Sequence, residues 1–296
     1  MILTVSCYKL RISSLKGMVS LNEPLIVNYR VHGNLGSFDY HSHQEYEIYF
    51  FHAGSCRYLI HNQIYDLERG DILLMDGIAL HKPNVRQNSE YVRSTIHFSP
   101  QWIESVLGEM DSVHLLDPFQ KLHHCLIRTN ENSESKQLEE LIRRLQVIKQ
   151  ISVHDVYAET EMKVLFLQVL ISVNRLGQMD SRKLPNKTEK TEYAENIGAY
   201  IQSNYMRKLT VASIAEALNL SKSYVSHLFK EMTGFTVLEY LMGCRLTQVK
   251  YLLEMEPDKA LKDIAIESGF ESVSHFSRYF RKKVGVTARE YRKLRQ

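Results

Sequence analysis

The chain has 296 residues, of which 44% are hydrophobic and 24% charged, and its formal net charge at pH 7 is +3. This length allows two domains that each bury a core, and this composition excludes a disordered or fibrous chain. The four cysteines, Cys7, Cys56, Cys125 and Cys244, form no CxxC pair, which argues against a disulfide framework or a structural zinc site. No apolar run is long enough for a signal peptide or a membrane span, so we expect a cytoplasmic protein with no membrane partner.

Residues from about 25 to 99 form a series of short predicted strands. Turn sequences such as His61-Asn62-Gln63 separate runs rich in aromatic and branched residues, at 46–51, 57–60, 71–75 and 92–98. Short strands that follow one another without helices between them indicate a barrel or a sandwich.

The sequence HSHQEYE at residues 41–47 places imidazole and carboxylate groups close together. Alternation along a strand puts His41, His43 and Glu47 on one face, and His81 returns toward them from a later strand. One interpretation is a divalent metal site made by these four residues, in a metalloenzyme or a metal sensor. A second is a pocket in which the same groups hydrogen-bond a small polar ligand together with Tyr29, Tyr49 and Tyr58. A third is structural, with histidines satisfied inside the barrel.

From about residue 101 the apolar period becomes helical. One stripe consists of Leu138, Leu141, Ile142, Leu145 and Ile148, and a second helix is predicted from roughly 154 to 177, with Tyr157, Met162, Leu165, Phe166, Val169 and Leu170 inward. Helices over 135–178 either pack on the barrel alone or also pair with a second subunit. The polar stretch after them, which contains Pro185 and lacks apolar periodicity, is the best candidate for a linker.

The C-terminal third contains an internal repeat. Residues 214–236, IAEALNLSKSYVSHLFKEMTGFT, match residues 264–287, IAIESGFESVSHFSRYFRKKVGVT, with an offset of 50 before the turn and 51 after it. In each copy a short helix ends at Asn219 or Gly269, which tolerate a left-handed backbone, and Ser221 or Ser272 then caps a second helix. This order predicts two helix-turn-helix units, whose second helices enter the major groove of DNA.

The charge distribution supports a nucleic-acid partner for this third. Residues 193–296 contain 16 Lys and Arg against 11 Asp and Glu, whereas residues 1–192 contain 21 against 23, and a basic surface suits an anionic partner. The predicted contacts to bases and phosphates are Ser223, Ser226, His227 and Lys230 in the first unit, and Ser274, Ser277, Arg278, Arg281 and Lys282 in the second. A connecting helix from 236 to 253, roughly 27 Å long, can hold the two units about one DNA turn apart.

The segment from about 193 to 296 resembles the DNA-binding domain of the AraC/XylS-type bacterial transcription regulators. The resemblance is carried by LSKSYVSHLFKEMTG, by the connecting helix and by IAIESGFESVSHFSRYFRKKVGVTAREYR. Ala288 stands where this family usually has proline, and His227 stands where a basic arginine is common, so the bases read by the first unit stay open. The resemblance adds Val273 to the base-facing positions, as a contact for a thymine methyl group.

The N-terminal region resembles the cupin-like sensor domain that often precedes this DNA-binding domain. The first cupin motif is similar to the segment with Gly36, His41, His43, Glu47 and Gly54, and the second is similar to GDILLMDGIALH, with Gly70 and His81. In the second motif, Asp76 and Ile78 replace the usual proline and glycine. The resemblance implies a sensor of a sugar or a similar polar metabolite.

These observations predict an α+β multidomain protein with three parts. A cupin-like β-barrel and its following helices, at 20–178, would bind the effector and dimerise; 179–192 would be a linker; and 193–296 would be an all-α domain with tandem helix-turn-helix motifs. The effector contacts would be His41, His43, Glu47, Tyr49, Tyr58 and His81.

We expect a transcription regulator without enzymatic activity. Its partners would be double-stranded promoter DNA, a small-molecule effector and a second copy of the chain, with RNA polymerase added if it activates. No cofactor is established by the sequence; if a divalent metal is bound, His41, His43, Glu47 and His81 would hold it. The alternatives are a cupin metalloenzyme fused to a DNA-binding domain and a metal-sensing regulator.

Overall fold

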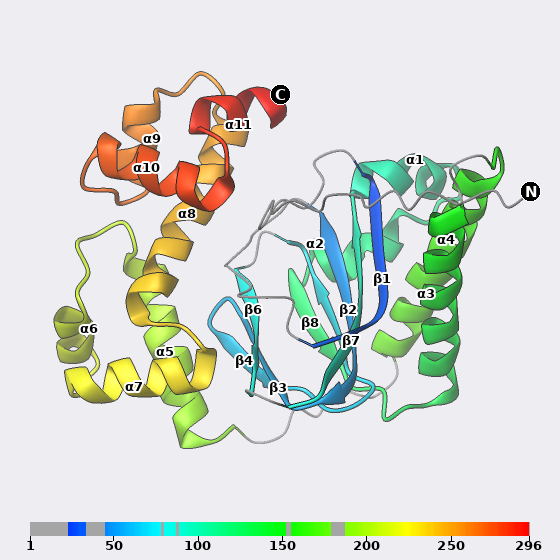
Figure 1. Ribbon diagram of the computed structural model, residues 1–296, viewed down its shortest axis with the longest axis horizontal. Helices are drawn as coiled ribbons and strands as arrows, with labels where there is room; N and C mark the ends of the chain where they lie inside the picture. The colour runs from blue at the N-terminus through cyan, green and yellow to red at the C-terminus, as the bar shows by residue number, and fades with distance from the viewer. Residues whose placement is uncertain are drawn as a thin grey trace, which may run out of the picture.

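The computed structural model describes residues 23–33, 45–77, 80–86, 89–151, 155–178 and 187–295. Figure 1 shows a β-rich N-terminal half beside a helical C-terminal half. The strands are β1 (Leu25–His32), β2 (Tyr46–Gly54), β3 (Cys56–Ile60), β4 (Gln63–Asp66), β5 (Ile72–Met75), β6 (His81–Val85), β7 (Tyr91–Phe98) and β8 (His124–Ile127). The helices of the first half are α1 (Pro100–Glu109), the short 3-10 helix η1 (Val113–Leu116), α2 (Asp117–Gln120), α3 (Ser133–Ile151) and α4 (Ala158–Gln178). Those of the second half are α5 (Glu189–Asn204), α6 (Val211–Ala217), α7 (Lys222–Thr233), α8 (Val237–Met255), α9 (Leu261–Glu267), α10 (Val273–Val284) and α11 (Ala288–Arg295).

Two antiparallel sheets face each other in the N-terminal half, in the orders β1-β7-β2-β5-β8 and β4-β3-β6. Alternation along the strands divides their side chains between two cores. In β2, Ile48 and Phe50 pack with residues of α1, α3 and α4, whereas Tyr49 and Phe51 point between the sheets. The layers therefore run from α3 and α4 through the five-stranded sheet and the three-stranded sheet to the helical half (Figure 1).

A buried histidine joins the five-stranded sheet to α3. His52 Nε2 lies 2.7 Å from Ser94 Oγ, and His52 Nδ1 lies 3.8 Å from Glu139 Oε1 on α3. Arg30 Nε and Tyr29 OH also hydrogen-bond Glu139 Oε1, at 2.7 and 3.1 Å. Burial lowers the pKa of His52 to about 4, although Glu139 favours its charged form.

This pKa makes the stability of the N-terminal half depend on pH. Below the ordinary pKa of about 6.5, His52 is protonated in the unfolded chain but not in the folded protein. The contribution of His52 to the free energy of unfolding is therefore fully present above pH 6.5 and is lost as the pH falls toward 4. We expect a loss of about 2–3 kcal/mol over this range from His52. Denaturant unfolding followed by the fluorescence of Trp102, which packs on Phe166, measures it.

The matched variant for this prediction is His52→Gln, which keeps a polar partner for Ser94 and removes the titration. Its stability should change less between pH 6.5 and 4.5 than that of the wild type. Some dependence should remain, because burial also lowers the pKa of His124 to about 4. Equal pH dependence in the two proteins would contradict the assignment to His52.

The helical half contains both predicted helix-turn-helix units, α6–α7 and α9–α10, which α8 connects. Ser221 accepts a hydrogen bond from the amide of Tyr224, and Ser272 accepts one from the amide of His275, so both predicted N-caps are confirmed. Asn219 and Gly269 take φ angles of 54° and 84°, the left-handed conformation that the sharp turns need. The two second helices pack into separate cores, through Val225, Leu228, Phe229 and Met232 in α7 and through Phe276 and Phe280 in α10.

The repeat continues beyond the two units. Thr236 and Glu239 form a capping box at the start of α8, and Thr287 and Glu290 exchange the same hydrogen bonds at the start of α11. A capping box satisfies amide groups that have no partner within the helix. The sequence duplication is therefore also a duplication of local structure.

Some predicted positions were wrong. The helix expected from about 154 begins at Ala158, and Tyr157 precedes it with 78% of its surface exposed instead of facing inward. Strand β8 was not predicted; it is four residues long and extends the sheet beside β5. Within the predicted linker, 179–186 lie outside the described residues and α5 already begins at Glu189, so the domain boundaries stay predictions.

Candidate functional site

The second helices of the two helix-turn-helix units, α7 and α10, are called the recognition helices, and both expose the predicted DNA contacts to solvent. The exposed residues are Ser223, Ser226, His227 and Lys230 on α7, and Val273, Ser274, Ser277, Arg278, Arg281 and Lys282 on α10. One face of each helix is anchored in its core, so the other face is available to enter a groove. Helix α8 has 19 residues, a rise of about 28 Å, which together with the offset of the two units from its ends can span the roughly 34 Å of one DNA turn.

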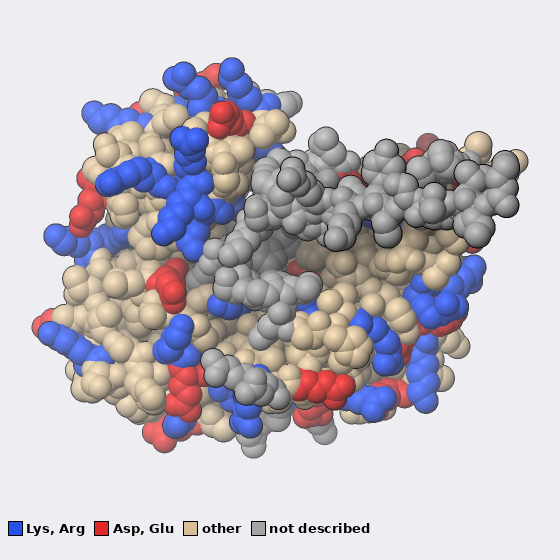
Figure 2. All heavy atoms as spheres, in the orientation of Figure 1, with Lys and Arg blue, Asp and Glu red and all other residues tan. Residues whose placement is uncertain are grey.

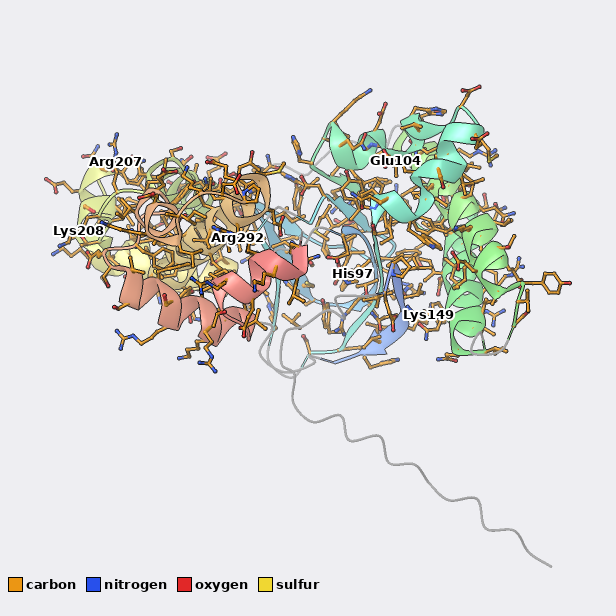
Figure 3. The ribbon with its side chains drawn as sticks, turned by 90° about the horizontal axis from the view of Figure 1, so that it is seen from above. His97, Glu104, Lys149, Arg207, Lys208 and Arg292 are labelled. Carbon is orange, nitrogen blue, oxygen red and sulfur yellow. The ribbon has the colours of Figure 1, made fainter. Side chains whose placement is uncertain are left out.

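The second unit carries the larger positive charge. Residues 256–295 contain ten Lys and Arg against six Asp and Glu, whereas residues 187–236 contain six against five. Figure 2 shows Lys and Arg side chains gathered over the part of the molecule formed by α9, α10 and α11. In Figure 3, Arg292 lies on this unit, and Arg207 and Lys208 lie at the side of the helical half away from the barrel. We expect the second unit to supply more of the salt-dependent attraction to phosphates.

A carboxylate on the first recognition helix is neutralised by its neighbours. Lys190 Nζ lies 3.0 Å from Glu231 Oε1, and His227 Nε2 lies 3.8 Å from Glu231 Oε2. The hydrogen bond from Lys190 is the largest cause that holds the pKa of Glu231 below its usual value. Lys190 thus offsets a charge that would otherwise repel the DNA backbone.

A cavity of about 130 Å³ lies inside the barrel. Its walls come from β1, β2 and β7 of one sheet and from β3 and β6 of the other. The lining residues are Asn28, Val31, Glu47, Tyr49, Tyr58, Pro83, Tyr91, Arg93, Thr95 and His97. Figure 3 shows His97 among the strands of the barrel. A concave site with a few converging polar groups is typical of small-molecule binding.

A buried carboxylate with two imidazoles forms part of this site. Glu47 Oε2 lies 3.2 Å from His81 Nε2, and Glu47 Oε1 lies 3.9 Å from His97 Nε2. The ring of His81 stacks on Tyr58, with 6.4 Å between centroids and 16° between planes. Glu47 and His81 are 3% and 1% exposed, so a ligand group that contacts either side chain would be desolvated.

The phenols and the guanidinium of the cavity have fixed roles. Tyr49 OH and Tyr91 OH share a hydrogen bond of 2.8 Å, and burial raises the pKa of Tyr49 and Tyr58 well above the ordinary value, so both stay protonated. Arg93 Nη1 donates to the carbonyl oxygens of Val31 and Gly33, at 3.2 and 2.7 Å. The site therefore offers neutral phenols together with the carboxylate of Glu47, the imidazoles of His81 and His97 and the guanidinium of Arg93.

The structure brings together some of the predicted effector residues. Glu47, Tyr49 and Tyr58 line the cavity and His81 lies directly behind Glu47, whereas His41 and His43 lie outside the described residues. Tyr29 was predicted beside them, but its hydroxyl reaches Glu139 on the opposite face of the sheet.

Sequence reasoning missed Arg93, Thr95 and His97, which line the cavity from β7. Their signal is present in the run VRSTIHF, where polar residues at every second position share one face of the strand. Among the residues that the structure describes, no group of three or more His, Cys, Asp and Glu side chains is placed to hold a metal ion. The same part of the chain has no helix long and apolar enough to cross a membrane.

Two families match the chain, one in each half. Residues 23–163 match the AraC-like ligand binding domain, and residues 214–294 match a helix-turn-helix domain. The Melibiose operon regulatory protein of Escherichia coli is 33% identical over 123 residues, which are 38% of this chain and only 40% of that relative.

Longer matches cover both halves. The Msm operon regulatory protein of Streptococcus mutans is 26% identical over 84% of each chain, and the HTH-type transcriptional activator RhaS of Escherichia fergusonii is 24% identical over 88% of this chain and 89% of that relative. The solved structure of ToxT from Vibrio cholerae is 19% identical over 92% of this chain and 99% of that one, with a TM-score of 0.35. The relatives are mostly transcription regulators, and the metalloenzyme alternative is not favoured. The chain therefore carries an AraC-like ligand binding domain followed by a helix-turn-helix domain, the pair of domains to which AraC-family transcription regulators are similar.

Proposed function

We propose that the protein binds promoter DNA in the cytoplasm and changes transcription when a small molecule fills its barrel, without catalysing a reaction. The observation that carries this proposal is the pair of recognition helices, each with a buried face and an exposed polar face. The base contacts would be made by Ser223, Ser226, His227, Val273, Ser274, Ser277 and Arg278, and the phosphate contacts by Lys230, Arg281 and Lys282.

The proposed effector is a neutral polar metabolite of the sugar class. The cavity presents phenol, imidazole and carboxylate groups, while Arg93, its one guanidinium, already donates to backbone carbonyls. Such a set suits hydroxyl groups, which both donate and accept hydrogen bonds. The name of the melibiose relative supports a sugar, although its match to this chain is short. The residues would be Glu47, Tyr49, Tyr58 and His81 with Arg93, Thr95 and His97, and we keep His41 and His43 as candidates.

A homodimer through α3 and α4 is the proposed assembly. A groove of about 630 Å³ is lined by residues of these two helices, among them the apolar Leu141 and Ile171. Glu134 and Glu140 lie beside Arg144 and Arg175 along it, so a second copy related by a two-fold axis can place acid against base. If the protein activates, RNA polymerase is a further partner. Sedimentation velocity tests the dimer, and a single-chain mass at micromolar concentration would contradict it.

Two measurements on the full chain test the function. Selection from a pool of random DNA duplexes should enrich a sequence with two half-sites about one helical turn apart. A melting-temperature screen with melibiose and other neutral sugars should give a stabilised protein, by about 2.7 kcal/mol at one hundred times the Kd. The absence of any enriched sequence would contradict DNA recognition. Stoichiometric iron or zinc in the purified protein would favour the metal-sensing or metalloenzyme alternative instead.

A further inference from the structure

The three-stranded sheet β4-β3-β6 alone separates the cavity from the first helix-turn-helix unit, and it is called the wall below. Along β6, Pro83 lines the cavity and His81, on the same face of the strand, contacts the cavity residue Glu47, whereas Lys82 and Asn84 face the helical half. Successive side chains of a strand point to opposite faces, so neighbouring residues of β6 touch the effector site on one side and the DNA-binding half on the other.

Strand β3 is divided in the same way. Tyr58 lines the cavity, while Arg57 and Leu59 on either side of it point outward. Leu59 belongs to the core of the first helix-turn-helix unit, and Arg57 Nη1 lies 3.1 Å from Met232 Sδ. Asp66 on β4 holds Arg57 in place through Oδ1, 2.8 Å from Nε.

The wall contacts α7 at its C-terminal end. Asn84 Nδ2 donates to the carbonyl oxygens of Glu231 and Met232, at 3.1 and 3.3 Å, in the last turn, where a helix leaves carbonyl groups without partners. Lys82 Nζ lies 4.3 Å from the centre of the Phe235 ring. The barrel therefore caps the recognition helix and does more than pack beside it.

Other contacts fix the same unit against the sheet. Tyr240 OH donates to the carbonyl oxygen of His61 at 2.6 Å, and the amide of Ile64 donates to Glu195 Oε1 at 2.9 Å. A methyl group added at Gly198 of α5 would come within 3.1 Å of Asn62 Cβ. The fit is close enough that a small shift of the β3–β4 hairpin must move α5 or α8 as well.

The internal repeat shows that this docking end is particular to the first unit. At the offset of 51, Met232 and Phe235 correspond to Lys283 and Val286, and Glu231 corresponds to Lys282. Tyr240 corresponds to Tyr291, whose hydroxyl donates to Glu254 of its own half at 2.7 Å, not to the barrel. The acidic Glu231 and the apolar Met232 at the end of α7 thus correspond to two lysines at the end of α10.

We propose that Arg57, Lys82 and above all Asn84 are positioning residues for α7, so that filling the cavity changes base recognition by the first helix-turn-helix unit and leaves that of the second unchanged. The effect of filling the cavity rests on the proposed effector site. Cavity occupancy would act on Tyr58, His81 and Pro83, and the same strands would carry the displacement to the end of α7.

The test uses the full-length chain and the duplex selected by the wild type. Asn84→Asp keeps the size of the side chain but replaces the donor by a carboxylate facing two carbonyl oxygens and the negative end of the helix dipole. Affinity is measured for duplexes that each carry one changed base pair. We expect discrimination to fall about 3- to 10-fold at base pairs read by α7, and to stay unchanged at those read by α10.

The control is Asn196→Asp, which makes the same charge change at an exposed position of α5 and should alter neither half-site. A purely structural effect of Asn84→Asp would lower the active fraction and reduce affinity for every duplex by one factor, with discrimination intact. That result, or equal loss at both half-sites, would overturn the proposal.

A second variant tests the link to the cavity without a ligand. Thr95→Phe adds volume from the wall opposite β3 and β6, and its circular dichroism and melting temperature establish that it folds. It should change discrimination at the same base pairs as Asn84→Asp; a change at the base pairs of α10, or none, would refute the coupling. The measurement on Asn84→Asp uses no effector, so its outcome does not depend on whether the cavity binds a sugar. The sugar screen tests that binding separately.

Discussion

Replacement of Arg278 by alanine is expected to weaken binding of the full-length protein to its selected duplex by about 1–3 kcal/mol, or roughly 5- to 150-fold. Arg278 is exposed on α10, two residues from Phe276 and two from Phe280, which are buried on the opposite face of the helix. A guanidinium in this place can donate two hydrogen bonds to guanine, and alanine can donate none. Fluorescence anisotropy with single-base variants of the duplex measures both affinity and selectivity.

The comparison for this prediction is Lys282→Ala, on the same helix. Lys282 is proposed to contact phosphate, so its loss should weaken binding to all duplexes alike and reduce the slope of log affinity against log salt by about one. Arg278→Ala should instead relax selectivity at one base pair. Unchanged affinity and selectivity in Arg278→Ala would remove this residue from the base contacts.

Gly269→Ala is expected to destabilise the helical half by about 2–4 kcal/mol. Gly269 has φ of 84°, and a Cβ there would lie 2.6 Å from the carbonyl oxygen of Tyr205 and 2.9 Å from Met206 Cα. The cost therefore has two sources, the left-handed backbone and an overlap with backbone atoms that cannot rotate away. Thermal unfolding followed by far-ultraviolet circular dichroism measures the loss.

The same substitution should also weaken DNA binding, because the turn at Gly269 is where the second unit meets the loop between α5 and α6. Arg245 on α8 donates from Nε to Tyr205 and from Nη2 to the carbonyl oxygen of Arg207, both at 2.9 Å. These bonds fix the loop after α5 against α8, and the turn of the second unit rests on that loop. A displaced turn would therefore change the separation of the two recognition helices.

Asn219→Gly is the matched control, since Asn219 occupies the equivalent turn of the first unit with φ of 54°. Glycine adopts this conformation readily, so the free energy of unfolding of this variant should stay within about 1 kcal/mol of that of the wild type. If Gly269→Ala unfolded at the same temperature as the wild type, the close approach at this turn would not be a constraint on the fold.

The helix-turn-helix units could be predicted from sequence because their signals are local. Ser221 and Ser272 as caps, and Asn219 and Gly269 as left-handed turn residues, depend on a few neighbours along the chain. The duplication then confirmed each signal against its copy. The exposed faces of α7 and α10 follow from the same helical periodicity.

The barrel was harder to predict because its site depends on which strands meet. Alternation from Leu25 and Val27 already puts Tyr29 on the face that packs against helices, so its assignment to the pocket was an error of register. The bulge between Asn28 and Val31, with Arg30 at φ of 45°, then brings Val31 to the cavity. The spacing of apolar and polar residues within β1 does not predict this bulge.

The docking of α7 on β6 could not be predicted at all. Asn84 and Glu231 are 147 residues apart, and an asparagine in a short edge strand has the same sequence signature whether it caps a helix or faces water. Only the arrangement of the two halves shows that one strand serves both the cavity and the recognition helix.

The most direct test of the account is the affinity of the full-length protein for its selected duplex, measured with and without a saturating concentration of a sugar that raises its melting temperature. An effector shifts DNA binding only if it binds the two states of the protein with different affinity. We predict a change in Kd of about 5- to 150-fold, the usual range of such coupling. An identical Kd and an identical choice of sites in both conditions would contradict the claim that the barrel controls DNA binding.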